Sequence, residues 1–134
     1  MDKLALDELS KRKKDQTLKL IEAADITRQI AEAVERGDAV AAQMLLGERE
    51  APVRALRELE EGIRAYLLER DEAEAIRLNE LLRGAEAATE EEKPLAEQVT
   101  QFRRLLDSVT AMDKQLSLRL GGKQSFYKKF RERE

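Results

Sequence analysis

Apolar residues recur at alternating steps of three and four over residues 95–120. This spacing places them on one stripe of an amphipathic helix or of a coiled-coil seam. Because a single helix cannot bury such a stripe alone, the pattern predicts that the rest of the chain, or another chain, covers it. Asp113 is the position of this series that is not apolar. The apolar members are Val99, Phe102, Leu106, Val109, Leu116 and Leu120, with Met112 beside Asp113.

A helical hairpin is predicted upstream of this stripe. The same spacing predicts a helix from about residue 15 to residue 36. Gly37 suits the position after a helix end, and Asp38 suits the N-cap of the next helix. The second helix is expected to run from Ala39 to about Glu69, antiparallel to the first. We expect a kink near Glu48–Pro52 and not a full break, because the apolar phase resumes on the same face beyond the proline.

A shorter helix and a polar connection lead to the last long helix. Residues 71–83 have helical spacing, and Gly84 is the expected stop. The acidic run Glu90–Glu92 is expected to form a solvated first turn, favoured by the positive end of the helix dipole. Pro94 fits the first turn of the helix that follows, and Gly121–Gly122 is expected to end it.

The composition agrees with this helical pattern. Of 134 residues, 40% are charged and 4% are aromatic, with few glycines and prolines, as in long-helix proteins. The predicted fold is all-α: an elongated antiparallel helical hairpin packed with a third long helix, in one domain spanning residues 1–134. Residues 1–14 either extend the first helix or form a loose arm, and the sequence leaves both open.

The net charge of −3 is unevenly distributed. Residues 119–134 carry six basic and two acidic side chains, so the remainder carries −7. We interpret residues 121–134 as a mobile, solvated basic tail in preference to a nucleic-acid arm, since the chain lacks a large basic excess. The tail aromatics Phe126, Tyr127 and Phe130 share one helical face, and they either pack back on the body or contact a partner.

Several kinds of chemistry are excluded by residue type. The chain has no cysteine and no histidine, so it cannot form disulfides, the usual zinc sites or the di-iron site of helical bundles. No Gly-rich phosphate loop and no calcium loop occurs in the sequence. We therefore expect a binding protein with no cofactor, and not an enzyme. No apolar run approaches the ~20 residues of a membrane span, and no secretory signal is found, so a cytoplasmic location without membrane insertion is expected.

Two stretches carry a resemblance to a known family. The first is residues 27–56, TRQIAEAVERGDAVAAQMLLGEREAPVRAL, where a helix and a Gly-Asp hinge precede Leu45-Leu46 and Glu48-Arg49-Glu50. The second is residues 105–120, LLDSVTAMDKQLSLRL, followed by a tail that contains Ser125-Phe126-Tyr127. Together they resemble the small flagellar type III export chaperones of the FlgN and FliT type.

The resemblance implies a cytoplasmic helical chaperone. Such proteins hold a late flagellar substrate, a hook-associated or filament-cap protein, by its C-terminal helical segment and deliver it to the export apparatus. The alternative that the residues leave open is a structural coiled-coil adaptor or a homodimer without an export role. A nucleic-acid-binding protein ranks third, since it rests only on Lys11–Lys14 and the tail.

The predicted partner-binding residues come from the last helix and the tail. Packing against the hairpin is the favoured role of the helical stripe, and a stripe wider than the hairpin covers would also bind a partner helix. Whether the tail gates this site or joins it is left open. Asp113 lies either at an edge or opposite a cation such as Arg49 or Arg64, because an unpaired buried carboxylate is costly. The predicted partner-binding residues are Val99, Phe102, Leu106, Val109, Met112, Leu116, Phe126, Tyr127 and Phe130.

Overall fold

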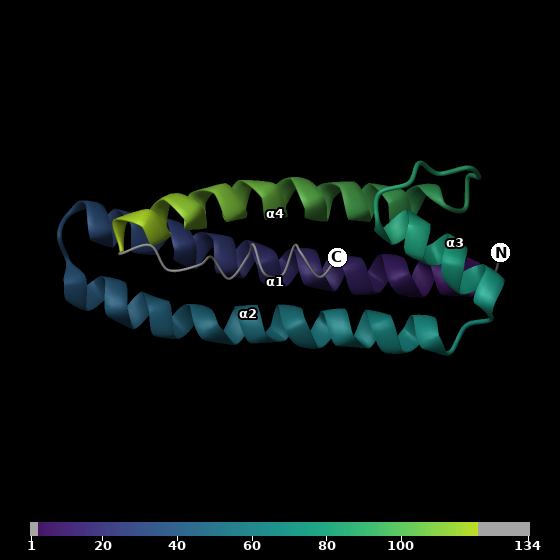
Figure 1. Cartoon of the computed structure of the whole chain (residues 1–134), viewed down its shortest axis with the longest axis horizontal. Coiled ribbons are helices and arrows are strands. Elements are labelled where there is room, and N and C mark those ends of the chain that lie inside the picture. The colour runs from purple at the N-terminus through teal and green to yellow at the C-terminus, as the bar shows by residue number, and fades with distance from the viewer. Residues whose placement is uncertain (1–2, 121–134) are drawn as a thin grey trace.

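The computed structural model describes residues 3–120, and over this range the chain forms four helices and no strand (Figure 1). The predicted all-α class is thus confirmed. The helices are α1 (Lys3–Glu35), α2 (Ala39–Leu68), α3 (Glu72–Leu82) and α4 (Lys93–Arg119).

The α1–α2 turn matches the turn expected from the sequence. Gly37 has a φ of 74°, the left-handed conformation that glycine adopts without steric strain. The Asp38 carboxylate accepts a hydrogen bond from the backbone N–H of Ala41 at 3.0 Å, so it caps α2. This short connection makes the two longest helices antiparallel neighbours.

The helix α1 is the central element of the bundle. It packs along both α2 and α4, whereas α2 and α4 make few close backbone approaches to each other. Figure 1 shows α1 between α2 and α4, with the three helices along the long axis and α3 at the end where α1 begins. The elongated hairpin with a third long helix is therefore the observed architecture, to which the short α3 is added.

The beginning of α1 resolves an alternative that the sequence leaves open. Residues 3–14 are helical and continue directly into the rest of α1. Ala5, Leu6 and Leu9 are buried against Ile63 of α2, residues of α3, and Leu95 of α4. These contacts with three other helices explain why this segment is an integral part of the bundle and not a loose arm.

The helix α2 continues through Pro52 without a break, as expected. The proline is buried beside Val53, so its ring contributes to the apolar face of the helix. A proline lacks only one backbone N–H, and the packing of the flanking turns offsets that loss. The kink near this residue stays a prediction.

Two apolar clusters form the core. Near the middle of the bundle, Leu20, Leu56 and Phe102 represent a cluster from α1, α2 and α4. At the α3 end, a second cluster adds Leu78 and Leu81 of α3. The helix α4 ends at Arg119, and the expected stop at Gly121–Gly122 lies outside the described residues.

Candidate functional site

The predicted partner-binding stripe of α4 lies inside the bundle. Five of its residues are at most 3% exposed, and they pack toward the hairpin. Met112 is half-buried. Packing against the hairpin, the role that the sequence favours for this stripe, accounts for its burial. A role of the same residues in binding a partner stays a prediction. The five are Val99, Phe102, Leu106, Val109 and Leu116.

The aromatic residues predicted for the tail, Phe126, Tyr127 and Phe130, lie outside the described residues. That the tail gates the site and that it joins the site therefore both stay predictions from the sequence.

The central helix α1 presents a continuous heptad stripe that includes polar side chains. Its buried positions alternate by three and four along most of the helix. Polar residues in such a stripe set the register of neighbouring helices, because each needs a partner at the same level of the bundle. Sequence reasoning missed Lys13 and Gln16, although their spacing from the apolar positions is a usable signal. The stripe comprises Leu6, Leu9, Lys13, Gln16, Leu20, Ala23, Thr27 and Ile30.

One polar layer joins the three long helices through Thr27, Arg49 and Asp113. Arg49 Nη1 donates to Asp113 Oδ1 at 2.7 Å and lies 3.3 Å from Thr27 Oγ1. The Thr27 hydroxyl in turn donates to the backbone carbonyl of Ala23 at 2.8 Å. Arg49 is 4% exposed and Asp113 is 1% exposed, so both charges are removed from solvent. The sequence offers Arg49 or Arg64 as the cation for Asp113, and in the structure Arg49 pairs with Asp113.

A second polar layer lies nearer the beginning of α1. Lys13 Nζ donates to Gln16 Oε1 at 2.9 Å, and Gln16 Nε2 donates to Glu60 Oε2 of α2 at 3.0 Å. The Lys13 ammonium also lies 4.0 Å from the ring centroid of Phe102 on α4, a cation–π contact. Arg64 approaches the other Glu60 oxygen at 3.7 Å. This layer again connects α1 with both of its neighbours.

The acidic run before α4 holds a third polar cluster, and here the expectation of a solvated turn is wrong for Glu92. Its side chain is buried and accepts from Arg77 Nε at 3.0 Å and Arg77 Nη2 at 2.7 Å. It also accepts from the backbone N–H of Ala88 at 2.8 Å. The hydrogen bond from Arg77 is the main reason that the pKa of Glu92 falls from 4.5 to about 2. Glu90 and Glu91 are exposed, as expected.

A row of hollows runs along one edge of α2. At the turn, a hollow of about 240 Å³ is lined by Ala42, Leu46 and residues of the α1–α2 turn. The next, of about 290 Å³, is lined by Leu46, Arg49, Val53 and other α2 residues. A third, of about 280 Å³, lies between α2 and α3. We call this row the α2 groove. Its α2 residues are Ala39, Ala42, Gln43, Leu46, Arg49, Glu50, Val53, Arg54, Arg57, Glu60, Ile63, Arg64 and Leu67.

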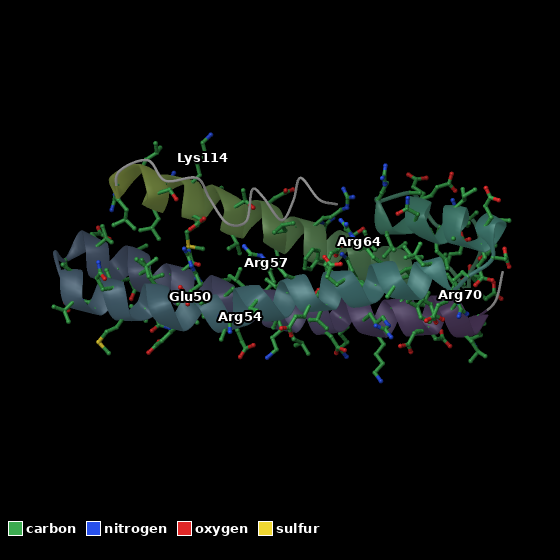
Figure 2. All side chains as sticks on the ribbon, turned by 60° about the horizontal axis from the view of Figure 1, so that its bottom comes forward. Glu50, Arg54, Arg57, Arg64, Arg70 and Lys114 are labelled. Carbon is green, nitrogen blue, oxygen red and sulfur yellow. The ribbon has the colours of Figure 1, made fainter. Side chains whose placement is uncertain are left out.

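The α2 groove has an arginine-rich rim. Arg54, Arg57 and Arg64 are exposed, and Glu50 is the exposed acid among them. Figure 2 shows Arg57 and Arg64 on the edge of α2 that faces α4. The side chains of Arg54 and Arg57 make no hydrogen bond or ion pair within residues 3–120. The hollow near the middle of α2 therefore places the exposed guanidinium groups of Arg54 and Arg57 beside the apolar side chains of Leu46 and Val53.

The described part of the chain contains no cluster of acidic side chains arranged to hold a metal ion. Within residues 3–120, each helix is too short or too polar to cross a bilayer.

Three comparisons place no known relative beside this chain. No protein-family model matches it, and neither a curated protein nor a solved structure shows a match.

Proposed function

We propose that this chain is a cytoplasmic export chaperone that binds the C-terminal helical segment of a late flagellar substrate. The substrate is a hook-associated or filament-cap protein, which the chaperone delivers to the export apparatus. The observation that supports this proposal best is the α2 groove on an elongated all-helical bundle. The groove spans roughly 40 Å of α2, since a helix rises about 1.5 Å per residue, and that length suits a helical segment of several turns.

The identity of the proposed cargo comes from the resemblance of residues 27–56 and 105–120 to flagellar export chaperones. Both stretches contribute to the layer of Arg49 and Asp113. The first also supplies one half of the α2 groove. Residues of the first stretch thus line the groove, and Asp113 of the second stretch pairs with Arg49, one of the lining residues.

Direct binding tests the proposal. Peptides from the C-terminal regions of hook-associated and filament-cap proteins should bind the full chain with micromolar affinity or better in isothermal titration calorimetry. Apolar burial in the groove should make this binding less sensitive to salt than a phosphate contact would be. Binding to a nucleic acid, with no binding to any flagellar peptide, would reject the export role.

A structural coiled-coil adaptor or homodimer is the second candidate. Exposed apolar residues such as Val40 and Met44 on α2, and Leu18 and Ile21 on α1, favour it, because a partner copy would cover them. Sedimentation equilibrium distinguishes the two functions: a stable dimer that binds no flagellar peptide supports the adaptor.

A further inference from the structure

We propose that the hollow at the α1–α2 turn is a docking site for the tail, residues 121–134 of the same chain. The tail enters this hollow with its aromatic side chains, Phe126, Tyr127 and Phe130. The inference stands apart from the proposed function, since it concerns how the chain closes one end of its own bundle. It follows from the lining of the hollow, from the place where α4 ends and from the charges around the turn.

The hollow at the turn has a mostly apolar lining. Its volume of about 240 Å³ exceeds the roughly 150 Å³ of an apolar protein cavity that binds benzene, so an aromatic ring fits inside it. Leu120 lines the hollow and is still 40% exposed, so apolar surface there remains open to solvent. Covering this surface with an aromatic ring is favourable. The apolar lining residues are Val34, Ala39, Ala42, Leu46 and Leu120.

The end of α4 brings the tail to this hollow. Leu120 directly precedes the tail and is itself part of the lining, and Figure 1 shows this end of α4 beside the α1–α2 turn. Gly121 and Gly122 follow, and glycine adopts the conformations that a chain reversal needs. Phe126 lies six residues beyond Leu120, or at most about 21 Å of chain, so its ring reaches the hollow. Attachment at this point also gives the tail a millimolar effective concentration, an advantage that a separate molecule lacks.

The opposite end of the bundle shows what a short amphipathic segment achieves. There the 11-residue helix α3 packs Leu78 and Leu81 against core residues of the three long helices, and both leucines are fully buried. Within residues 3–120, no further helix closes the turn end in this way. Phe126 and Phe130 are four residues apart, a spacing that places both on one helical face. The tail therefore has the length and the apolar spacing of a second closing segment.

The charge around the turn also suits the tail. Glu32 and Glu35 lie in the last turn of α1, where the helix dipole is already negative and no basic residue offsets it. Both are exposed, and neither has a polar partner among the described residues. Arg36 follows the helix but approaches Asp38 instead, at 3.7 Å. The tail carries five basic and two acidic side chains, so docking places positive charge beside this negative helix end.

Two pairs of tail substitutions in the full chain test the docking. The ring variant, Phe126→Ser with Phe130→Ser, removes two aromatic side chains. The control, Lys128→Ser with Glu132→Ser, changes two tail residues outside the aromatic face. Both variants keep the net charge of −3. Circular dichroism checks that both also keep the helical content of the wild type.

Methyl NMR supplies the first readout. The methyl signals of Val34 and Leu46, which line the hollow, should shift in the ring variant because they lose the ring currents of the docked aromatics. They should keep their wild-type positions in the control. The methyl signals of Val99, a buried residue of the cluster at the α3 end, should stay unchanged in both variants. Unshifted Val34 and Leu46 signals in the ring variant, or equal shifts in the control, would overturn the inference.

Filling the hollow tests the docking from the other side. Ala42→Leu enlarges a lining residue, and Ala51→Leu makes the same change at an exposed position of α2. Trypsin cleavage after Lys123, followed by mass spectrometry, measures access to the tail. Ala42→Leu should accelerate this cleavage by at least about threefold over both wild type and Ala51→Leu, because a displaced tail is accessible. Gln43→Trp, at the exposed rim of the hollow, is a second filling variant and should act in the same direction. Cleavage at the wild-type rate in both filling variants would overturn the inference.

Dilution distinguishes the tail from other occupants. The faster cleavage of the ring variant relative to wild type should not depend on protein concentration, because the docking is intramolecular. A difference that disappears on dilution would show that a second copy covers the hollow, which also overturns the inference. Every readout uses the chain alone, so a failure of flagellar peptides to bind would reject the export role and leave the docking of the tail standing.

Discussion

The Arg49–Asp113 and Arg77–Glu92 pairs of this bundle use the same chemical groups in different ways. Arg77 and Glu92 are 15 residues apart, and both carboxylate oxygens are hydrogen-bonded. Arg49 and Asp113 are 64 residues apart and deeply buried, and only Oδ1 of the aspartate is used. No described group donates a hydrogen bond to the buried Oδ2.

The two pairs therefore have different roles: one orders a local connection, and the other sets the axial alignment of two helices. The Arg77–Glu92 pair holds the connection between α3 and α4, and its carboxylate is fully satisfied. The Arg49–Asp113 pair connects α2 to α4, which otherwise make few close approaches. A buried pair that leaves one oxygen without a partner contributes little net stability. It does, however, fix the axial alignment of the two helices that it joins.

Breaking the deep pair from one side should have the largest effect. Arg49→Met leaves the Asp113 carboxylate buried without a cation, so the free energy of unfolding should fall by about 3–5 kcal/mol. Urea denaturation followed by circular dichroism measures it. The control Arg54→Met changes an exposed arginine and should stay within about 0.5 kcal/mol of wild type. A loss below about 1 kcal/mol for Arg49→Met would contradict the assigned burial of this pair.

Removing the local pair should have a smaller effect. Glu92→Ala deletes the acceptor of Arg77 and of the Ala88 N–H, so the free energy of unfolding should fall by about 1–3 kcal/mol. Glu91→Ala, at the exposed neighbour, is the control and should change it by less than about 0.5 kcal/mol. Equal effects of the two substitutions would show that the run is solvated throughout.

The local pair should also respond to acid. The folded state lowers the pKa of Glu92 to about 2 from 4.5, so the carboxylate stabilises the fold fully above pH 4.5. That contribution is lost as the pH falls from 4.5 toward about 2. The stability difference between wild type and Glu92→Gln, measured by thermal melts across this window, should therefore shrink on acidification. A difference that is constant from pH 7 to about 2 would contradict the lowered pKa of Glu92.

Replacing both members of the deep pair should have the smallest effect on stability. Arg49→Met with Asp113→Leu removes both charges and fills their volume with apolar groups. The free energy of unfolding should lie within about 1 kcal/mol of wild type or above it. Urea denaturation beside the Arg49→Met single variant measures this recovery. Failure to recover would mean that Arg49 supports the fold through more than its pairing with Asp113.

Local features of the fold were predictable from the sequence. Gly37 and Asp38 mark the hairpin because a left-handed glycine and a capping carboxylate act within a few residues. The helical spacing likewise identified the buried face of α4. Such features depend on nearest neighbours along the chain, so one sequence suffices to find them.

Features that depend on distant partners were harder to predict. Spacing places Asp113 within the apolar series of α4, but it does not say whether Asp113 lies at an edge or which helix faces it, so the sequence offers both Arg49 and Arg64 as its cation. Glu92 resembles its exposed neighbours in sequence, and only the folded connection brings Arg77 to it. The α2 groove also depends on distant partners, because Lys13 of α1 and residues of α3 line its third hollow together with α2.

The anchored connection before α4 has a consequence for exchange between copies of the chain. In domain swapping, a terminal helix leaves its own body and packs into that of a neighbour, and the connecting segment must straighten. Straightening would break the bonds from Arg77 to Glu92 and to the carbonyl of Glu86, and the bond from the Ala88 N–H to Glu92. The loss of these bonds therefore opposes exchange and keeps α4 on its own hairpin. Without them, a long helix with an apolar stripe would be well suited to being exchanged.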